Sequence, residues 1–181
     1  MTDNNSKVKE LALRAMLVAL CFVLSFVESR IPAFIAVPGI KLGITNLVVL
    51  VALYMLGWKD AFTINIIRIV LAGLTFGSLM SMWYSLAGGM LATLGMIFLK
   101  YALDAKIVTV SVSGALLHNL GQIAVAMIIL RTDALFYYLV VLWISGAVAG
   151  VIIGILGYLV LNRIMKIPKN DKEDNDSYRK E

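Results

Sequence analysis

Long apolar stretches that carry almost no charge, separated by short charged breaks, constrain this chain more than any other feature. Of its 181 residues, 61% are hydrophobic and only 15% are charged. A helix needs about 20 apolar residues to cross a bilayer, and several stretches approach or exceed that length. Soluble domains contain about 45–50% apolar residues, and a small one could not bury so much more. We therefore predict an all-α, polytopic membrane protein.

The charged breaks divide the chain into six predicted transmembrane helices. Their approximate limits are residues 10–27, 42–56, 61–76, 79–101, 108–130 and 135–164. These helices form one predicted transmembrane domain, residues 10–165, between a polar N-terminus (1–9) and a charged tail (166–181) that we expect to be disordered.

Two of the predicted connections are distinctive. Residues 31–41 contain two prolines and a glycine, which exclude a regular helix there. This connection is nevertheless apolar, so we expect it to fold back onto the membrane face or over a cavity. Residues 57–60, Gly-Trp-Lys-Asp, are predicted to form a tight turn between the second and third helices.

The distribution of Lys and Arg predicts that both ends of the chain lie in the cytoplasm. Cytoplasmic segments of membrane proteins are enriched in these residues. With six spans and the N-terminus inside, the outer segments hold only Arg30, Lys41 and Arg131. The net charge of +5 therefore reflects topology, and we predict no nucleic-acid partner. There is no P-loop and no metal spacing such as CxxC or HExxH, so we also predict no metal site, no cofactor and no catalytic residues.

Arg68 lies in the middle of the predicted third span. A charge at that depth costs at least about 2.5 kcal/mol unless it faces a partner or a water-filled cavity. Two interpretations are open: a structural pair with Glu28 or a helix-end carbonyl, or a contact with a bound ligand. Asn65 precedes Arg68 by three residues, so the two side chains share one face of the helix.

A second polar group lies in the predicted fifth span and comprises His118, Asn119 and Gln122. His118 and Gln122 are four residues apart and share a face, while Gly121 lets another backbone approach closely. A buried polar side chain needs a partner, which a neighbouring helix or a bound ligand can supply. The clustering favours a face that lines a cavity.

Polar and aromatic residues near the predicted outer surface form a third group. Lys41 and Asn46 lie where the second helix begins, and Trp83 and Tyr84 lie in the outer third of the fourth. Aromatic residues at this level are typical of the membrane–water interface. The same rings could instead wall a planar ligand, since aromatic faces bury a large area with fixed geometry.

Small residues at helical spacing indicate close helix packing. Two stripes are present, one on the first helix and one on the sixth: Ala12, Ala15 and Ala19, and Gly146, Gly150 and Gly154. Such stripes let helix backbones touch. We expect the glycines to pack inside the protein, whereas the alanines could contact a partner membrane protein.

Five segments of the sequence carry a resemblance to a known family. They are residues 28–32 (ESRIP), 38–46 (PGIKLGITN), 85–89 (SLAGG), 111–115 (SVSGA) and 118–122 (HNLGQ). In this order they resemble motifs of the bacterial membrane family called heptaprenyl diphosphate synthase component I, or Gx transporter. The resemblance extends over about residues 10–165.

This family is grouped with the S components of energy-coupling factor (ECF) vitamin transporters. The resemblance therefore implies a six-helix fold in the bacterial inner membrane, with a substrate site beneath the first loop and open to the outer side. It implies as partners a transmembrane coupling protein, contacted by Ala12, Ala15 and Ala19, and cytoplasmic ATPase subunits. Together with Arg68, the residues expected to bind the small-molecule substrate are Lys41, Asn46, Trp83, Tyr84, His118, Asn119 and Gln122.

Three functions remain open at this level. The first is a non-enzymatic S component that takes up a small vitamin or a precursor of a cofactor or quinone. The alternative is a non-catalytic membrane subunit associated with heptaprenyl diphosphate synthesis. Direct prenyl transfer would need clustered aspartates to hold magnesium, and the acidic run at 171–174 lies in the predicted tail. A third possibility, a proton-coupled carrier, has Glu28 as its one candidate carboxylate.

Overall fold

The computed structural model describes residues 2–30, 43–131 and 136–165, and within them it contains six α-helices. The helices are α1 (Thr2–Arg30), α2 (Ile44–Met55), α3 (Trp58–Thr75), α4 (Leu79–Ala102), α5 (Ile107–Leu130) and α6 (Phe136–Met165). The predicted all-α class is confirmed. Most of the predicted 31–41 connection, including Lys41, and the predicted tail at 166–181 lie outside the described residues.

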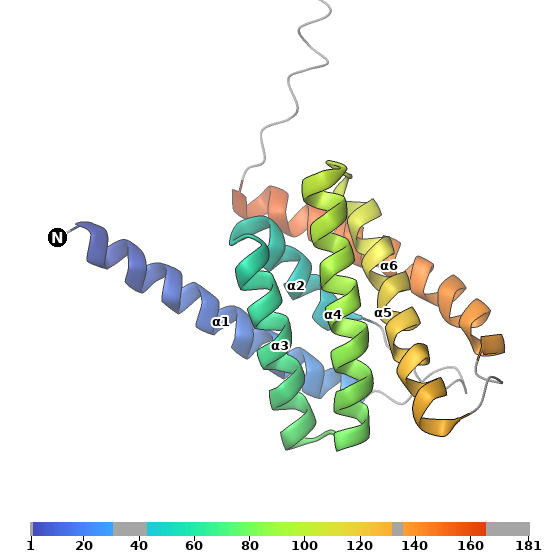
Figure 1. Ribbon diagram of the computed structural model, residues 1–181. Helices are drawn as coiled ribbons and strands as arrows, with labels where there is room; N and C mark the ends of the chain where they lie inside the picture. The colour runs from blue at the N-terminus through green and yellow to red at the C-terminus, as the bar shows by residue number, and fades with distance from the viewer. Residues whose placement is uncertain (1, 31–42, 132–135, 166–181) are drawn as a thin grey trace, which may run out of the picture.

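Five of the helices form a closed ring of packed neighbours. Around this ring α3 packs on α4, α4 on α5, α5 on α6, α6 on α2, and α2 on α3. The remaining helix, α1, packs against α2 and α3 from outside the ring. Its N-terminal half extends well beyond the other helices (Figure 1).

Four helices are long and apolar enough to cross a membrane. These segments are Lys7–Arg30, Leu79–Ala102, Ile107–Leu130 and Phe136–Ile164. The 12 residues of α2 span only about 18 Å at 1.5 Å per residue, compared with about 30 Å for the hydrocarbon layer. The chain is thus a helical membrane protein in which α2 is too short to cross the layer alone.

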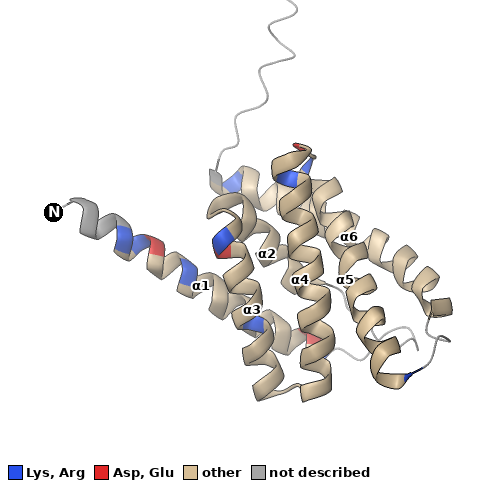
Figure 2. Cartoon of the chain, in the orientation of Figure 1, with Lys and Arg blue, Asp and Glu red and all other residues tan. Residues whose placement is uncertain are grey.

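Charged residues gather at one end of the ring. Figure 2 shows Lys and Arg in the N-terminal part of α1 and at the end where α3 begins and α4 and α6 finish. We call this the basic end; it holds Lys59, Lys100, Lys106 and Arg163. The opposite end, where α3 finishes and α4 begins (Figure 1), is called the loop end.

The core of the protein is built around α2. Seven of the 12 residues of α2 are buried, among them the consecutive run from Val48 to Leu53. They pack against Leu17 and Cys21 of α1 and Ile64 of α3, and the same cluster extends to Met96 and Val110. We call this cluster the α2 core. A helix that is buried on all sides must be apolar all round, which explains the Val- and Leu-rich sequence of α2.

Glycines instead hold α4, α5 and α6 together. A Cβ on Gly88 of α4 would lie 2.6 Å from the carbonyl oxygen of His118, and one on Gly121 would lie 2.8 Å from that of Ala87. On α6, a Cβ on Gly150 would lie 2.7 Å from the Cα of Val112. These contacts, with those of Gly146 and Gly154, are called the glycine seams. The expectation that the α6 glycines pack internally is confirmed.

Two helix boundaries differ from the prediction. The turn expected at 57–60 is shorter, because α3 already begins at Trp58 and only Leu56 and Gly57 separate it from α2. Gly57 adopts a φ of 97°, which favours glycine and lets one residue reverse the chain. The first helix begins at Thr2 rather than near residue 10, so the polar N-terminus continues the helix.

Candidate functional site

Both ends of α2 are bonded by charged side chains from other helices. At the N-terminus of α2, the Glu28 carboxylate of α1 accepts hydrogen bonds from the backbone N–H groups of Gly43 and Ile44 and, at 2.7 Å, from the Thr45 hydroxyl. At the basic end, the Lys100 ammonium of α4 donates to the carbonyl of Leu53 at 2.7 Å. An anion at the N-terminus and a cation at the C-terminus both complement the helix dipole. Short α2 is thereby fixed between α1 and α4.

Arg68 lies beside this arrangement and is 9% exposed. Its Nε–H donates to Asn65 Oδ1 at 2.9 Å. The amide of Asn65 in turn donates to the carbonyl of Gly89 at 2.9 Å and to the Thr93 hydroxyl at 2.8 Å, both on α4. The predicted shared face of Asn65 and Arg68 is therefore real, and it joins α3 to α4.

The other side of the Arg68 guanidinium is not satisfied in this way. Its Nη2 is buried and has no hydrogen-bond partner among the described residues. Glu28 and Cys21 of α1 lie within electrostatic range of the guanidinium. Both oxygens of Glu28, however, already accept bonds at the start of α2. The predicted structural pair with Glu28 is thus a long-range attraction rather than a direct ion pair within the part of the chain that the structure describes.

Helix register places the buried polar residues at a similar depth. Thr45 and Arg68 each lie roughly 17 Å along their helices from the turn between α2 and α3, at 1.5 Å per residue. Asn65 bonds to Gly89, and the next glycine along α4, Gly88, packs on His118 of α5. Thr45, Asn65, Arg68 and His118 therefore lie in one layer across the middle of the bundle. We call this the polar layer.

The polar group of α5 is divided between two neighbouring helices. Asn119 donates to the carbonyl of Leu142 on α6 at 2.6 Å, and Gly146 leaves the space that this amide occupies. His118 and Gln122 face α4 instead, where both lie against Gly88. The Asn119 amide is therefore used to join helices, as polar side chains in membranes commonly are.

The aromatic pair of α4 lies nearer the surface. Trp83 is 55% exposed, whereas Tyr84 is partly buried. An apolar groove of about 470 Å³ between α4 and α5 is lined by Trp83, Leu86, Ala87, Met90, Val125 and Ile129. Trp83 is the one predicted ligand residue in this lining. Asn46, in the first turn of α2, is partly buried, so the described part of the predicted set does not gather in this groove.

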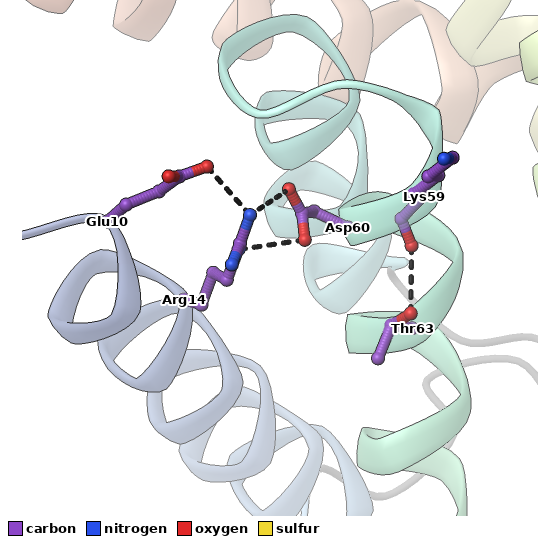
Figure 3. Close-up of polar contacts among 5 residues, drawn as sticks. All are labelled: Glu10, Arg14, Lys59, Asp60 and Thr63. Carbon is purple, nitrogen blue, oxygen red and sulfur yellow. Dashed lines mark hydrogen bonds and ion pairs between the residues drawn. The ribbon is translucent and has the colours of Figure 1, made fainter. Parts of the chain in front are cut away.

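The alanine stripe lies on the exposed face of α1 along the stretch that packs against the ring. Ala12, Ala15 and Ala19 are all exposed. Nearby, Arg14 holds this part of α1 to the start of α3: its guanidinium contacts Asp60 at 2.8 Å and Glu10 at 2.7 Å (Figure 3). The exposed alanines therefore stand next to an ion-paired attachment point rather than inside the bundle.

Several residues that bond across helices escaped the sequence prediction. Thr93 and Ser111 are buried in apolar helices, and Ser111 donates to the carbonyl of Gly150 at 2.8 Å. Lys100, assigned to a polar connection, bonds to α2. A hydroxyl within an apolar span is a weak signal because it can also bond to its own helix.

One comparison with known proteins identifies a family. The model of heptaprenyl diphosphate synthase component I matches residues 17–160. The chain belongs to this family. The match includes every described member of the polar layer and the motifs at 85–89 and 118–122. No curated protein matches the chain, and no solved structure does.

Membership of the component I family bears on catalysis. Component I is a non-catalytic subunit of the synthase, which confirms the prediction that this chain is not itself an enzyme. Within the described residues, no group of three or more His, Cys, Asp or Glu side chains could hold a metal ion. The buried polar residues of this component I chain are therefore better understood through binding and packing.

Proposed function

We propose that the chain is a non-catalytic membrane subunit associated with heptaprenyl diphosphate synthesis. The family match over residues 17–160 carries this proposal. Prenyl transfer needs clustered aspartates that hold magnesium. A non-catalytic subunit would therefore need a protein partner that supplies this site. This chain would supply the membrane-embedded part of the assembly.

Reconstitution tests this function directly. The chain, carrying an affinity tag, is expected to retain a soluble prenyl synthase subunit when the two are purified from one host. In liposomes, the pair should form heptaprenyl diphosphate faster than the soluble subunit alone. Failure both to associate and to stimulate would remove the proposal. Prenyl transfer by the isolated chain would contradict its non-catalytic role.

The polar layer supports a second candidate, the substrate-binding S component of an ECF-type importer. A binding protein in a membrane needs polar groups at depth. Arg68 and its neighbours lie at that level. We propose that the loop end faces outward and the basic end faces the cytoplasm, in agreement with the positive-inside rule. The substrate would be a small vitamin or a precursor of a cofactor or quinone.

The exposed alanines of α1 supply the partner surface that this second candidate requires. Ala12, Ala15 and Ala19 would contact a transmembrane coupling protein that carries the ATPase subunits. Co-purification with ATPase subunits, and a small molecule found by mass spectrometry in the purified complex, are expected. Replacing Ala15 with Leu should release the coupling protein, whereas Val23→Leu on a different exposed part of α1 should not. Retention by both variants would contradict the interface.

A further inference from the structure

The Arg68 guanidinium has hydrogen-bonding capacity that the described part of the protein does not use. Arginine carries five N–H donors in a planar fork. Asn65 fixes the Nε side, and its amide is itself anchored to α4 by two further bonds. Nη2 remains buried with no hydrogen-bond partner among the described residues. A buried donor in this condition destabilises the protein, whereas an ordinary surface arginine bonds to water.

Charge strengthens this argument. An uncompensated cation deep in a membrane protein is costly and marks a functional site by default. Glu28 is close enough to attract the guanidinium, yet its oxygens bond to Gly43, Ile44 and Thr45. Three of the roughly four acceptor positions of this carboxylate are therefore engaged at the start of α2, and no ion pair joins it to Arg68 within the described residues. Among the described residues, Arg68 Nη2 therefore lacks a negatively charged acceptor oxygen.

We propose that Arg68 receives an oxyanion, a carboxylate or a phosphate oxygen pair, from a bound ligand. The α2 core fills the bundle toward the basic end. Toward the loop end α2 stops at Ile44, at the depth of Arg68. Arginine forks bind carboxylate and phosphate in a bidentate manner. The Arg68 fork is thus suited to the anionic group of the ligand.

This inference rests on the proposed role as a binding subunit, and it names the ligand chemistry for both candidates. In prenyl diphosphate synthesis the oxyanion would be a diphosphate. In an importer it would be an acid group of the nutrient. The diphosphate and the acid group of a nutrient would bind Arg68 through the same oxyanion chemistry. A diphosphate probe and a carboxylate probe distinguish the two kinds of ligand.

The test measures anion binding to the full chain in phosphatidylcholine nanodiscs by calorimetry, with inorganic pyrophosphate and benzoate as probes. We expect the native chain to bind at least one probe. Arg68→Gln should weaken that binding by about ten- to a hundredfold, since it removes a charge-assisted bidentate contact. Arg68→Lys keeps the charge but loses the fork, so its affinity should lie between the two. The control, Arg163→Gln at the exposed basic end, should bind like the native chain.

Glu28→Gln provides a test of opposite sign. Glutamine can still accept from the start of α2 but no longer competes for Arg68, so oxyanion affinity should rise severalfold. A purely structural arginine would show no such increase. If Arg68→Gln fails to fold, Arg68→Lys and Glu28→Gln decide the matter. Absence of binding to the native chain, or equal affinity in all variants, would overturn the inference. Association with a synthase or ATPase partner is measured separately, so either proposal can fail alone.

Discussion

The α2 core and the glycine seams join helices by opposite means. In the α2 core, large side chains such as Leu50 and Leu53 fill the space around one helix that is buried on all sides. In the seams, residues without a side chain, such as Gly88 and Gly121, bring backbones of neighbouring helices into contact. Within lipid there is little hydrophobic force between helices, so packing and hydrogen bonds must hold them. Large side chains provide the packing in the α2 core, whereas the absence of side chains allows close backbone contact in the glycine seams.

This difference also divides the polar residues. The seams contain side chains that bond across helices, as Asn119 bonds to α6 and Ser111 to Gly150. The α2 core is apolar inside, and its charged partners, Glu28 and Lys100, are confined to the two ends of α2. Arg68 lies between the two regions: its Nε bonds to Asn65, whereas its Nη2 has no partner in the described part of the chain.

The largest expected effect comes from removing volume in the α2 core. Leu53→Ala should lower the free energy of unfolding by about 2–5 kcal/mol, because it leaves a cavity at a residue that is 0% exposed. Unfolding in mixed micelles measures the change. Leu159→Ala on α6, where the side chain is 55% exposed, should cost less than about 0.5 kcal/mol. Equal losses would mean that α2 is not the centre of the packing.

Adding volume to a seam should have the next largest effect. Gly88→Ala places a Cβ against the backbone of α5, which cannot move aside easily, and should cost about 1–3 kcal/mol. The matched variant is Gly95→Ala on the same helix. There the close contact is the end of the Leu117 side chain, which can rotate away. A loss at Gly95 as large as that at Gly88 would contradict the role of the backbone contact.

Removing a charge from the end of α2 should have a smaller effect. Lys100→Met keeps most of the side-chain stem but loses the hydrogen bond to Leu53 and the favourable charge at the C-terminus of the helix. We expect a loss of about 1–2 kcal/mol in the same unfolding assay. Exposed Lys106 serves as the control, and Lys106→Met should be nearly neutral. A neutral Lys100→Met would show that α2 is held by its apolar packing alone.

The smallest effect should come from the ion pair that attaches α1. Arg14 and Asp60 are only partly buried, with 40% and 18% of their side chains exposed. A double-mutant cycle with Arg14→Gln and Asp60→Asn should give a coupling of about 0.2–1 kcal/mol that decreases as salt is added. A coupling that salt does not change would indicate a buried attachment of α1 instead.

Most of the helix limits could be predicted from hydropathy alone. The fourth helix was expected at 79–101 and runs from Leu79 to Ala102, and the fifth was expected at 108–130 and begins at Ile107. Charged or turn-forming residues bound these spans, so composition changes sharply there. The predicted turn at 57–60 was wrong in extent because the reversal depends on the backbone angles of Gly57 alone, and a composition window does not resolve one residue.

The candidate site was predictable only in part. The three-residue spacing of Asn65 and Arg68 indicated a shared face, and the structure confirms their bond. The bonds from Glu28 to the start of α2 could not be inferred, since they join residues on either side of the connection at 31–42. The same holds for Lys100 and Leu53, which lie on helices that are not consecutive in the chain.

The sequence by itself determined the membrane class, the six helices and the family motifs, because each depends on residues close together in the chain. Only the tertiary structure decided which polar side chains are consumed in joining helices. Asn119 is bonded to α6, whereas Arg68 Nη2 has no hydrogen-bond partner among the residues that the structure describes. Hydrogen-bond partners come from other helices, so a polar residue within a span shows that a partner is needed but not which helix supplies it.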